Sequence, residues 1–430
     1  MPSSTDTPPP ESALPPSSQP PVLPRQQAIR LLVLVCTAQV LAQIGTYTWP
    51  ALLPQFFEIW RLSNSQAGWI TAAFYLSYVL AVPILVSATD WADPRRIYLL
   101  GVSCTVLSHA GMALLAEGFW SAFAFRLLAG VGWAGTYMTG LKLLADRLEA
   151  RLLSRATAGH VASIGMAGAF SFVVAGAVNS AWGWRGAFVL ASLCAAGAWL
   201  IAFGVMPRTQ PRPRAVGTRR FELLPVLRNR AAMAYSIAYA AHTWELNVLR
   251  GWAVAFLAYV ATQHPGAAPA WLAPTVAATA MALLGTVVSV VGNELSISLG
   301  RVRLIGVAMT LSLAFAATIG FLGPLSYGLA VALVLGYGIV IWMDSSSLTA
   351  GAAGSADPAR RGAGLAVHSM LGYGGGFFGP LAVGWTLDLA GGMSQLGWGL
   401  AFLQVGLVVL VGFAAFRLLR PRGLAGDRPA

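Results

Sequence analysis

The stretch GAFVLASLCAAGAWLIAFGVM, residues 186–206, decides the fold class because none of its residues carries a charge. A helix needs about 20 mostly apolar residues to cross the hydrocarbon core of a bilayer. Directly after it, residues 207–230 carry seven arginines. A long apolar run that ends in a basic segment is typical of a membrane helix whose end lies in the cytoplasm.

The composition of the whole chain supports the same interpretation. Only 10% of the 430 residues are charged and 57% are apolar, whereas a soluble domain carries about 25% charged residues. In a soluble protein the net charge of +12 would suggest nucleic-acid binding. Here the basic residues lie between apolar runs, so we expect a lipid bilayer as partner and no nucleic acid.

Three further features of the composition limit the function. Cys36, Cys104 and Cys194 all lie inside apolar runs and lack the spacing of a metal site. We therefore expect neither a metal nor a cofactor. Residues 1–27 are rich in proline and serine, which predicts a disordered cytoplasmic tail.

Apolar runs recur along the rest of the chain and predict twelve membrane spans in an all-α protein. Their approximate bounds are 28–53, 66–88, 97–117, 119–145, 156–179, 186–206, 231–261, 270–292, 302–323, 325–349, 363–387 and 396–418.

The basic residues predict the orientation of these spans. With the N-terminus in the cytoplasm, all but four of the 27 basic residues fall on the cytoplasmic side. Arg61 and Arg185 fall on the other side, and Arg126 and Arg250 lie within the membrane. We expect a multi-pass protein of the cell inner or plasma membrane with both termini in the cytoplasm.

The long basic stretch 207–230 divides the spans into an N-terminal bundle, 28–206, and a C-terminal bundle, 231–419, followed by a cytoplasmic tail, 420–430. The halves also resemble each other at an offset of 205 residues, since Tyr137-Met138 aligns with Trp342-Met343. Repeated halves of this kind are a known plan of secondary transporters.

Several local motifs lie in the loops and small-residue spans. The loop after the second span reads Val86-Ser-Ala-Thr-Asp90-Trp-Ala-Asp93-Pro-Arg95-Arg96, and the fourth span contains Arg126-Leu-Leu-Ala-Gly130-Val-Gly132. The loop after the eighth span reads Gly300-Arg301-Val-Arg303. The remaining motifs are Trp182-Gly183-Trp184-Arg185-Gly186-Ala187-Phe188 before the sixth span and Gly375-Gly376-Phe-Phe-Gly379-Pro380 in the eleventh.

Together these motifs resemble the major facilitator superfamily over about residues 28–420. In the first loop the acidic residue and the arginine pair of the family motif are present, and both glycines and the first arginine are replaced. The resemblance implies two pseudo-symmetric six-helix bundles and a secondary transporter that works by alternating access. It also implies a gating role for loop residues, namely Asp90, Arg95, Arg96, Gly300 and Arg301. Their alternative role is to set the topology.

The resemblance further implies that the first, fourth, seventh and tenth spans line a central cavity. Polar and aromatic residues gather on these spans, and ionisable groups at membrane depth are functional candidates. The candidates for substrate binding or proton coupling are Gln39, Gln43, Tyr47, Arg126, Trp133, Tyr137, Tyr239, His242, Glu245, Arg250 and Asp344.

Two of these candidates are acids with alternative roles. Glu245 lies near the middle of its span, where it could carry a proton or balance the charge of a substrate, or pair structurally with Arg250 or Arg126. Asp344 lies near the cytoplasmic end of its span and could bind in the cavity, act in a gate, or be a helix-end charge in contact with water.

The leading hypothesis is a proton-coupled carrier of a small organic solute, and the membrane arginines favour a solute with an anionic group. We expect it to function as a monomer and not as an enzyme. One alternative is a drug efflux antiporter, which the aromatic residues favour and the absence of proline from residues 165–176 disfavours. A non-transporting membrane sensor or intramembrane enzyme is a second alternative, but the chain lacks a sizeable soluble domain, a His-Glu-x-x-His motif and a Gly-x-Ser-x-Gly turn.

Overall fold

The structure, a computed structural model, describes residues 23–89, 92–208, 223–357, 360–419, 421, 423–424 and 427. The predicted disordered tail up to residue 22, residues 209–222 of the basic linker, and Asp90 lie outside these residues.

Regular structure in the described residues is entirely helical. The helices of the N-terminal half are α1 (Arg25–Gln43), α2 (Thr48–Ala51), α3 (Leu53–Ile59), α4 (Asn64–Ala88), α5 (Pro94–Leu115), α6 (Phe119–Ala145) and α7 (Ala150–Val205). Those of the C-terminal half are α8 (Leu223–Arg228), α9 (Arg230–Gln263), η1 (Ala270–Leu272), α10 (Pro274–Leu299), α11 (Arg301–Leu322), η2 (Gly323–Leu325), α12 (Tyr327–Ser355), α13 (Arg361–Leu389) and α14 (Gln395–Leu418).

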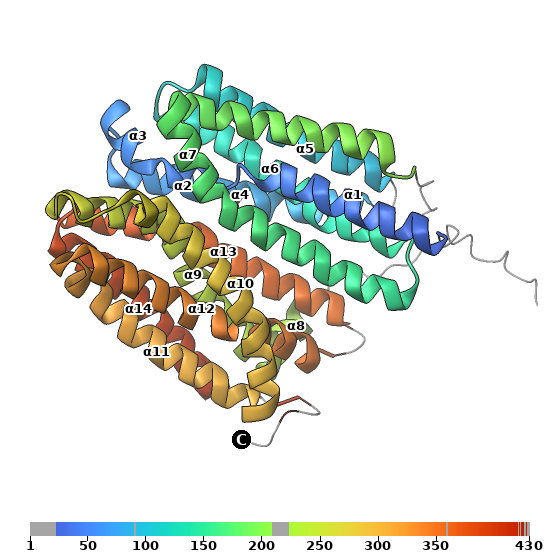
Figure 1. Ribbon diagram of the computed structural model, residues 1–430. Coiled ribbons are helices and arrows are strands. Elements are labelled where there is room, and N and C mark those ends of the chain that lie inside the picture. Colours follow the sequence, from blue (N-terminus) through green and yellow to red (C-terminus); the bar gives the residue numbers. More distant parts are fainter. Residues whose placement is uncertain are drawn as a thin grey trace, which may run out of the picture.

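These helices form two six-span bundles that lie side by side, coloured blue to green and yellow to red in Figure 1. The 56-residue helix α7 supplies two spans, because Gly183 adopts φ 71° and ψ 174° and interrupts the helix there. Among the described residues, seven helices are long and apolar enough to cross a membrane by length and composition. The other long helices, α1, α6, α9 and α13, carry the polar residues discussed below.

The first span is broken, although its sequence predicts one continuous helix over 28–53. Helix α1 ends at Gln43 and α2 begins at Thr48. A β-carbon on Gly45 would lie 2.6 Å from both the Ala191 side chain and the His109 ring, so only glycine fits this bend. Side chains of other helices then bind the backbone groups that the break leaves free.

Glycines of the Arg126 motif set the packing of α6. A β-carbon on Gly130 would collide with the Phe74 carbonyl group of α4, and one on Gly132 would lie 2.9 Å from the Gly101 carbonyl oxygen of α5. Small residues allow such close approach of membrane helices. The motif glycines therefore hold α6 against both neighbours and fix the position of its cavity-facing residues.

The two halves meet along two helix pairs. Helix α4 packs against α13, where Gly68 lies against the Pro380 backbone and Gly384 against that of Asn64. Helix α7 packs against α10, where Gly176 contacts Thr275. Asn64 and Thr275 lie at the helix ends that face away from both chain termini. The face of the molecule that holds the start of α1 and the end of α14 is called the termini side below.

Candidate functional site

A cavity of about 520 Å³ lies between the two halves. Six helices or their connections line it: the broken first span, α6 and α7 from the N-terminal half, and α9, α10 and α12 from the C-terminal half. Its polar lining residues are Gln43, Thr46, Tyr47, Trp133, Thr157, Arg250, Thr286, Ser289, Trp342 and Ser346. Apolar and small side chains, mostly from α7, complete the wall, so the cavity offers a few polar groups on an apolar surface, as solute-binding sites commonly do.

Arg250 is the charged residue that lines this cavity. Its guanidinium carbon lies 5.6 Å from the centre of the Tyr47 ring and 4.9 Å from that of Trp342. Tyr47 belongs to one half and Trp342 to the other, so the cation lies between aromatic rings of both halves. In the part of the chain that the structure describes, no carboxylate pairs with Arg250. A partly buried arginine without a carboxylate can bind an anionic ligand through two parallel hydrogen bonds.

Three further predicted residues line the cavity wall opposite Arg250's own helix. Gln43 accepts a hydrogen bond from the Thr46 hydroxyl at 2.7 Å and donates one to the Thr136 hydroxyl at 3.3 Å. Tyr47 stacks on Phe172 with ring centres 5.0 Å apart, and Trp133 stacks on Phe74 at 5.1 Å. These contacts hold the polar and aromatic edges of the wall in defined positions.

Other predicted residues of the first and fourth spans do not line this cavity. Gln39 is fully buried and accepts a 3.4 Å hydrogen bond from the Tyr98 hydroxyl. Tyr137 stacks on His160 at 6.0 Å. Arg126 is buried, donates to the Thr46 carbonyl at 3.3 Å and lies 4.7 Å over the Phe74 ring. The Arg126 guanidinium therefore binds the backbone at the break of the first span.

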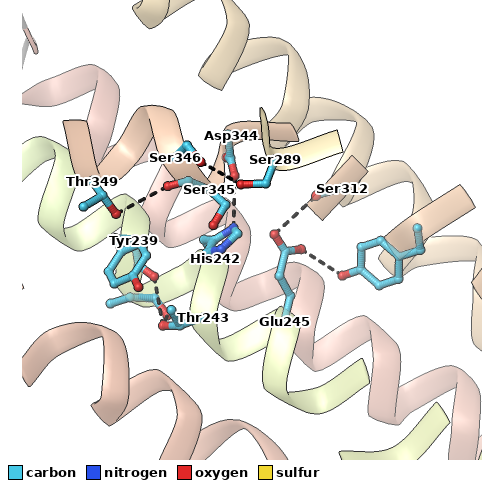
Figure 2. A network of polar contacts seen from close by, with 12 residues as sticks. Tyr239, His242, Thr243, Glu245, Ser289, Ser312, Asp344, Ser345, Ser346 and Thr349 are labelled. Atoms are coloured by element: carbon cyan, nitrogen blue, oxygen red, sulfur yellow. Dashed lines mark hydrogen bonds and ion pairs between the residues drawn. The ribbon is translucent and has the colours of Figure 1, made fainter. Parts of the chain in front are cut away.

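Glu245 is buried inside the C-terminal half and not in the cavity wall. One carboxylate oxygen accepts a hydrogen bond from the Tyr337 hydroxyl at 2.9 Å and the other from the Ser312 hydroxyl at 3.3 Å. Figure 2 shows the carboxylate pointing between α11 and α12. Neither Arg126 nor Arg250 pairs with it among the described residues. A hydroxyl group can donate a hydrogen bond to a carboxylate or accept one from a carboxylic acid, so these contacts suit either form of Glu245.

His242 and Asp344 form a second buried group one turn from Glu245. Their Nδ1 and Oδ1 atoms lie 3.0 Å apart, and both residues are at most 3% exposed. The distance is that of an ion pair, although the alignment does not meet that of a hydrogen bond. Figure 2 shows Asp344 reaching from α12 toward the His242 ring on α9. Asp344 is therefore buried, which does not fit the alternative of a helix-end charge in contact with water.

An aromatic and histidine ladder continues from this pair. The Tyr239 ring stacks on His242 at 5.6 Å and on His368 at 4.1 Å. His368 lies near hydroxyls of Ser236, at 3.2 Å, and Thr349, at 3.4 Å. These contacts join α13 to α9 and α12. The ladder connects the His242–Asp344 pair with the first turns of α13, toward the termini side.

The gating candidates among the described residues lie in separate places on the termini side. Arg95 donates to the Phe203 carbonyl and its backbone N–H donates to Asp93, which caps α5. Arg96 is exposed. Gly300 has φ 90° and precedes α11.

Arg301 is buried, although it follows a loop. It pairs with both oxygens of Asp427 at 3.1 Å and donates to the Ser347 carbonyl at 3.3 Å. The pair of Arg301 with Asp427 had no signal in the sequence, because 126 positions separate the two residues.

A polar contact across the halves also escaped the sequence interpretation. Asp388, at the end of α13, accepts three hydrogen bonds of 2.8–3.0 Å from the first turn of α4: the backbone and side-chain N–H groups of Asn64 and the backbone N–H of Ser65. A carboxylate is favourable at a helix N-terminus. This contact holds the halves together on the face opposite the termini side.

Known proteins share this architecture and parts of this sequence. A model of the Major Facilitator Superfamily matches residues 35–380. The chain is 30% identical over 128 residues to the "Probable sphingolipid transporter spinster homolog 2" of Arabidopsis thaliana, covering 30% of this chain and 26% of that protein. It is also 30% identical over 168 residues to the "Uncharacterized transporter YgaY" of Escherichia coli O157:H7, covering 38% and 41%. The matched segments therefore span less than half of either relative.

A likeness in structure covers much more of the chain. The crystal structure of a bacterial homolog to the human lysosomal transporter Spinster, in an inward-facing and occupied conformation, superimposes with a TM-score of 0.75. The alignment covers 92% of this chain and 97% of that chain at 15% identity. At this identity the likeness establishes a common fold.

Proposed function

The chain belongs to the Major Facilitator Superfamily and is a multi-pass membrane transporter of that type, and on this premise we propose that its substrate is a small organic anion. The observation that carries the proposal is Arg250, a cation that has no carboxylate partner among the described residues and lines a cavity shared by both halves. A carboxylate or similar group of the solute would bind the guanidinium while its organic part contacts the aromatic wall.

The position of Arg250 also supports alternating access as the transport mechanism. Tyr47 and Trp342, the rings on either side of its guanidinium, belong to opposite halves. A solute bound at Arg250 therefore contacts the surfaces that separate when the halves rock. Binding energy at this position can favour one arrangement of the halves over another.

Proton coupling is the second part of the proposal. Glu245 and the His242–Asp344 pair lie inside the C-terminal half, away from the cavity wall. Glu245 carries the coupling proton. The route from the termini side to Glu245 runs past His368 and Tyr239 to the His242–Asp344 pair. Titratable groups inside a membrane commonly form such relays. We place both termini in the cytoplasm, as the basic residues predict.

The efflux alternative draws support from the aromatic lining, since Tyr47, Trp133 and Trp342 all face the cavity. Aromatic rings pack against neutral drug-like compounds, and their faces attract cations. A cationic drug would be repelled by the positive charge of Arg250, which is why the organic anion is preferred. A strain that lacks the gene would become sensitive to toxic cations only under the efflux alternative.

The test is a thermal-shift screen of the purified protein with organic carboxylates, their amides and cationic drugs. A ligand of the folded state raises the apparent melting temperature. Carboxylates should stabilise the protein where the matching amides do not, and Arg250→Gln should remove the difference.

Arg185→Gln is the matched control, because the Arg185 guanidinium also lies over a tryptophan ring, Trp184 at 4.7 Å, but outside the cavity. Stabilisation of the Arg250→Gln variant by the same carboxylates would remove Arg250 from the binding site.

A further inference from the structure

A second groove lies on the membrane-facing surface of the C-terminal half, far from the central cavity. Its volume is about 500 Å³, and it lies between the first turns of α11 and the last turns of α14. The lining residues are Val302, Arg303, Gly306, Val307, Thr310, Leu311 and Arg417. The groove thus combines two arginines at one end with apolar and small residues along its length.

The two arginines lie at the same depth, on the termini side. Arg303 is in the first turn of α11, and Arg417 is in the last turn of α14. Both side chains are exposed. The Arg417 guanidinium carbon lies 5.2 Å over the Phe413 ring, which holds this charge along the groove. Both cations therefore lie where a helix leaves the hydrocarbon core.

Neither arginine is neutralised within the described residues. The neighbouring Arg301 differs, because it turns inward and pairs with Asp427. Arg303 and Arg417 have no ion pair in the described part of the chain. Arg230 adds positive charge nearby, since its guanidinium donates to the Leu418 carbonyl at 3.3 Å. The mouth of the groove is therefore cationic.

The rest of the groove is lined mainly by apolar and small residues, which suit a hydrocarbon chain. Val307 is 47% exposed and Leu311 is 41% exposed, one turn apart on α11. Gly306 keeps the groove open beneath Arg417, because the nearest atoms to a β-carbon there are the Arg417 and Phe413 side chains at 3.8 Å. An acyl chain could follow Val307 and Leu311 toward the bilayer centre while its headgroup stays beside the arginines.

We propose that this α11–α14 groove binds an anionic glycerophospholipid of the leaflet on the termini side, with its phosphate between Arg303 and Arg417 and one acyl chain along Val307 and Leu311. Basic pockets between membrane helices bind anionic headgroups, and arginine binds phosphate through parallel hydrogen bonds. The site is independent of the transported solute, because it faces the lipid and shares no residue with the central cavity.

The test uses the purified full-length protein in an uncharged detergent with three separate probes: dioctanoyl phosphatidylglycerol, dioctanoyl phosphatidylcholine and inorganic phosphate. Native mass spectrometry gives the bound fraction for each lipid, and thermal shift gives the stabilisation by all three. Phosphatidylglycerol should bind more tightly than phosphatidylcholine. Each of Arg303→Gln and Arg417→Gln should weaken its binding about fivefold, since one arginine near a headgroup contributes about 1 kcal/mol.

Two further variants separate the groove from general charge. Arg30→Gln removes an exposed arginine of α1, which lies on the termini side but in the N-terminal half. This variant should leave phosphatidylglycerol binding unchanged. Gly306→Leu keeps both arginines but fills the groove, and should weaken lipid binding while leaving the protein folded.

Three results would overturn the proposal. The first is equal binding of phosphatidylglycerol and phosphatidylcholine by the unmodified protein. The second is unchanged phosphatidylglycerol binding by the Arg303→Gln/Arg417→Gln double variant. The third is stabilisation by inorganic phosphate as large as that by phosphatidylglycerol, which would assign the arginines to a free anion.

Discussion

The two halves of this transporter share a fold but bury different kinds of charge at membrane depth. The N-terminal half buries the cation Arg126, which binds the Thr46 carbonyl and the Phe74 ring. The C-terminal half buries two carboxylates at membrane depth, Glu245 and Asp344, each beside groups that can exchange or share a proton. At the 205-residue offset between the halves, Asp344 corresponds to Thr139, a neutral residue.

This difference indicates a division of labour between the halves. An arginine remains charged at any physiological pH, so Arg126 contributes a fixed charge to the packing of the N-terminal half. Carboxylates and histidine can change their protonation, so the C-terminal half holds the groups that could follow a proton gradient. Arg250, in the cavity wall between the halves, is where solute and protein charge would meet.

The largest effect is expected at that boundary. Arg250→Gln should lower the affinity for an anionic solute roughly 100-fold, because truncating one partner of a desolvated charge pair costs several kcal/mol. Equilibrium binding to the purified protein measures this change, with Arg185→Gln as control. An affinity within a factor of three of the unmodified protein would show that solute charge is bound elsewhere.

A second change addresses the acidic half directly. Glu245→Gln keeps the side-chain shape but cannot carry a proton, so proton-driven accumulation in proteoliposomes should disappear. The loss is about tenfold for each pH unit of gradient if one proton accompanies each solute. Downhill exchange should persist, and Glu294→Gln, an exposed acid on α10, is the control. Undiminished accumulation by Glu245→Gln would remove this residue from coupling.

A third change loosens the contact between the halves. Asp388→Ala removes three hydrogen bonds to the start of α4. It should increase about fivefold the population of molecules whose halves are separated on that face, a change of about 1 kcal/mol. Spin labels at Glu58 and Gln263 measure the separation. Glu117→Ala, an exposed acid on the same face, should leave the distance distribution unchanged. An identical distribution for Asp388→Ala would show that packing alone closes this face.

The smallest effect is expected in the N-terminal half. Arg126→Gln keeps a donor for the Thr46 carbonyl and should reduce transport by no more than about threefold, since the loss stays below the fivefold that a whole hydrogen bond of about 1 kcal/mol would give. The pH dependence of transport should stay that of the unmodified protein. A changed pH profile would contradict the division of labour between the halves.

The span pattern, the repeated halves and the family were predictable because they depend on local apolar runs and on loop arginines. The break of the first span was not, because the side chains that leave no room for a β-carbon at Gly45 are those of His109 and Ala191, which lie far away in the chain. The partners of Glu245 were unpredictable for the same reason. Tyr337 is 92 residues away, and no periodicity relates α9 to α12. The roles predicted for the site residues remain predictions.

The break of the first span also divides it into pieces that pack against different helices. Its inner piece, α1, packs in the N-terminal half against α7, whereas α2 and α3 also touch α9 of the other half, with Phe57 6.3 Å from Trp252. The Thr46 carbonyl is bound by Arg126 and the Tyr47 amide by Ser171, so neither depends on helical hydrogen bonds. Bending of the span at this point when the halves rock would carry Tyr47 away from or onto Arg250.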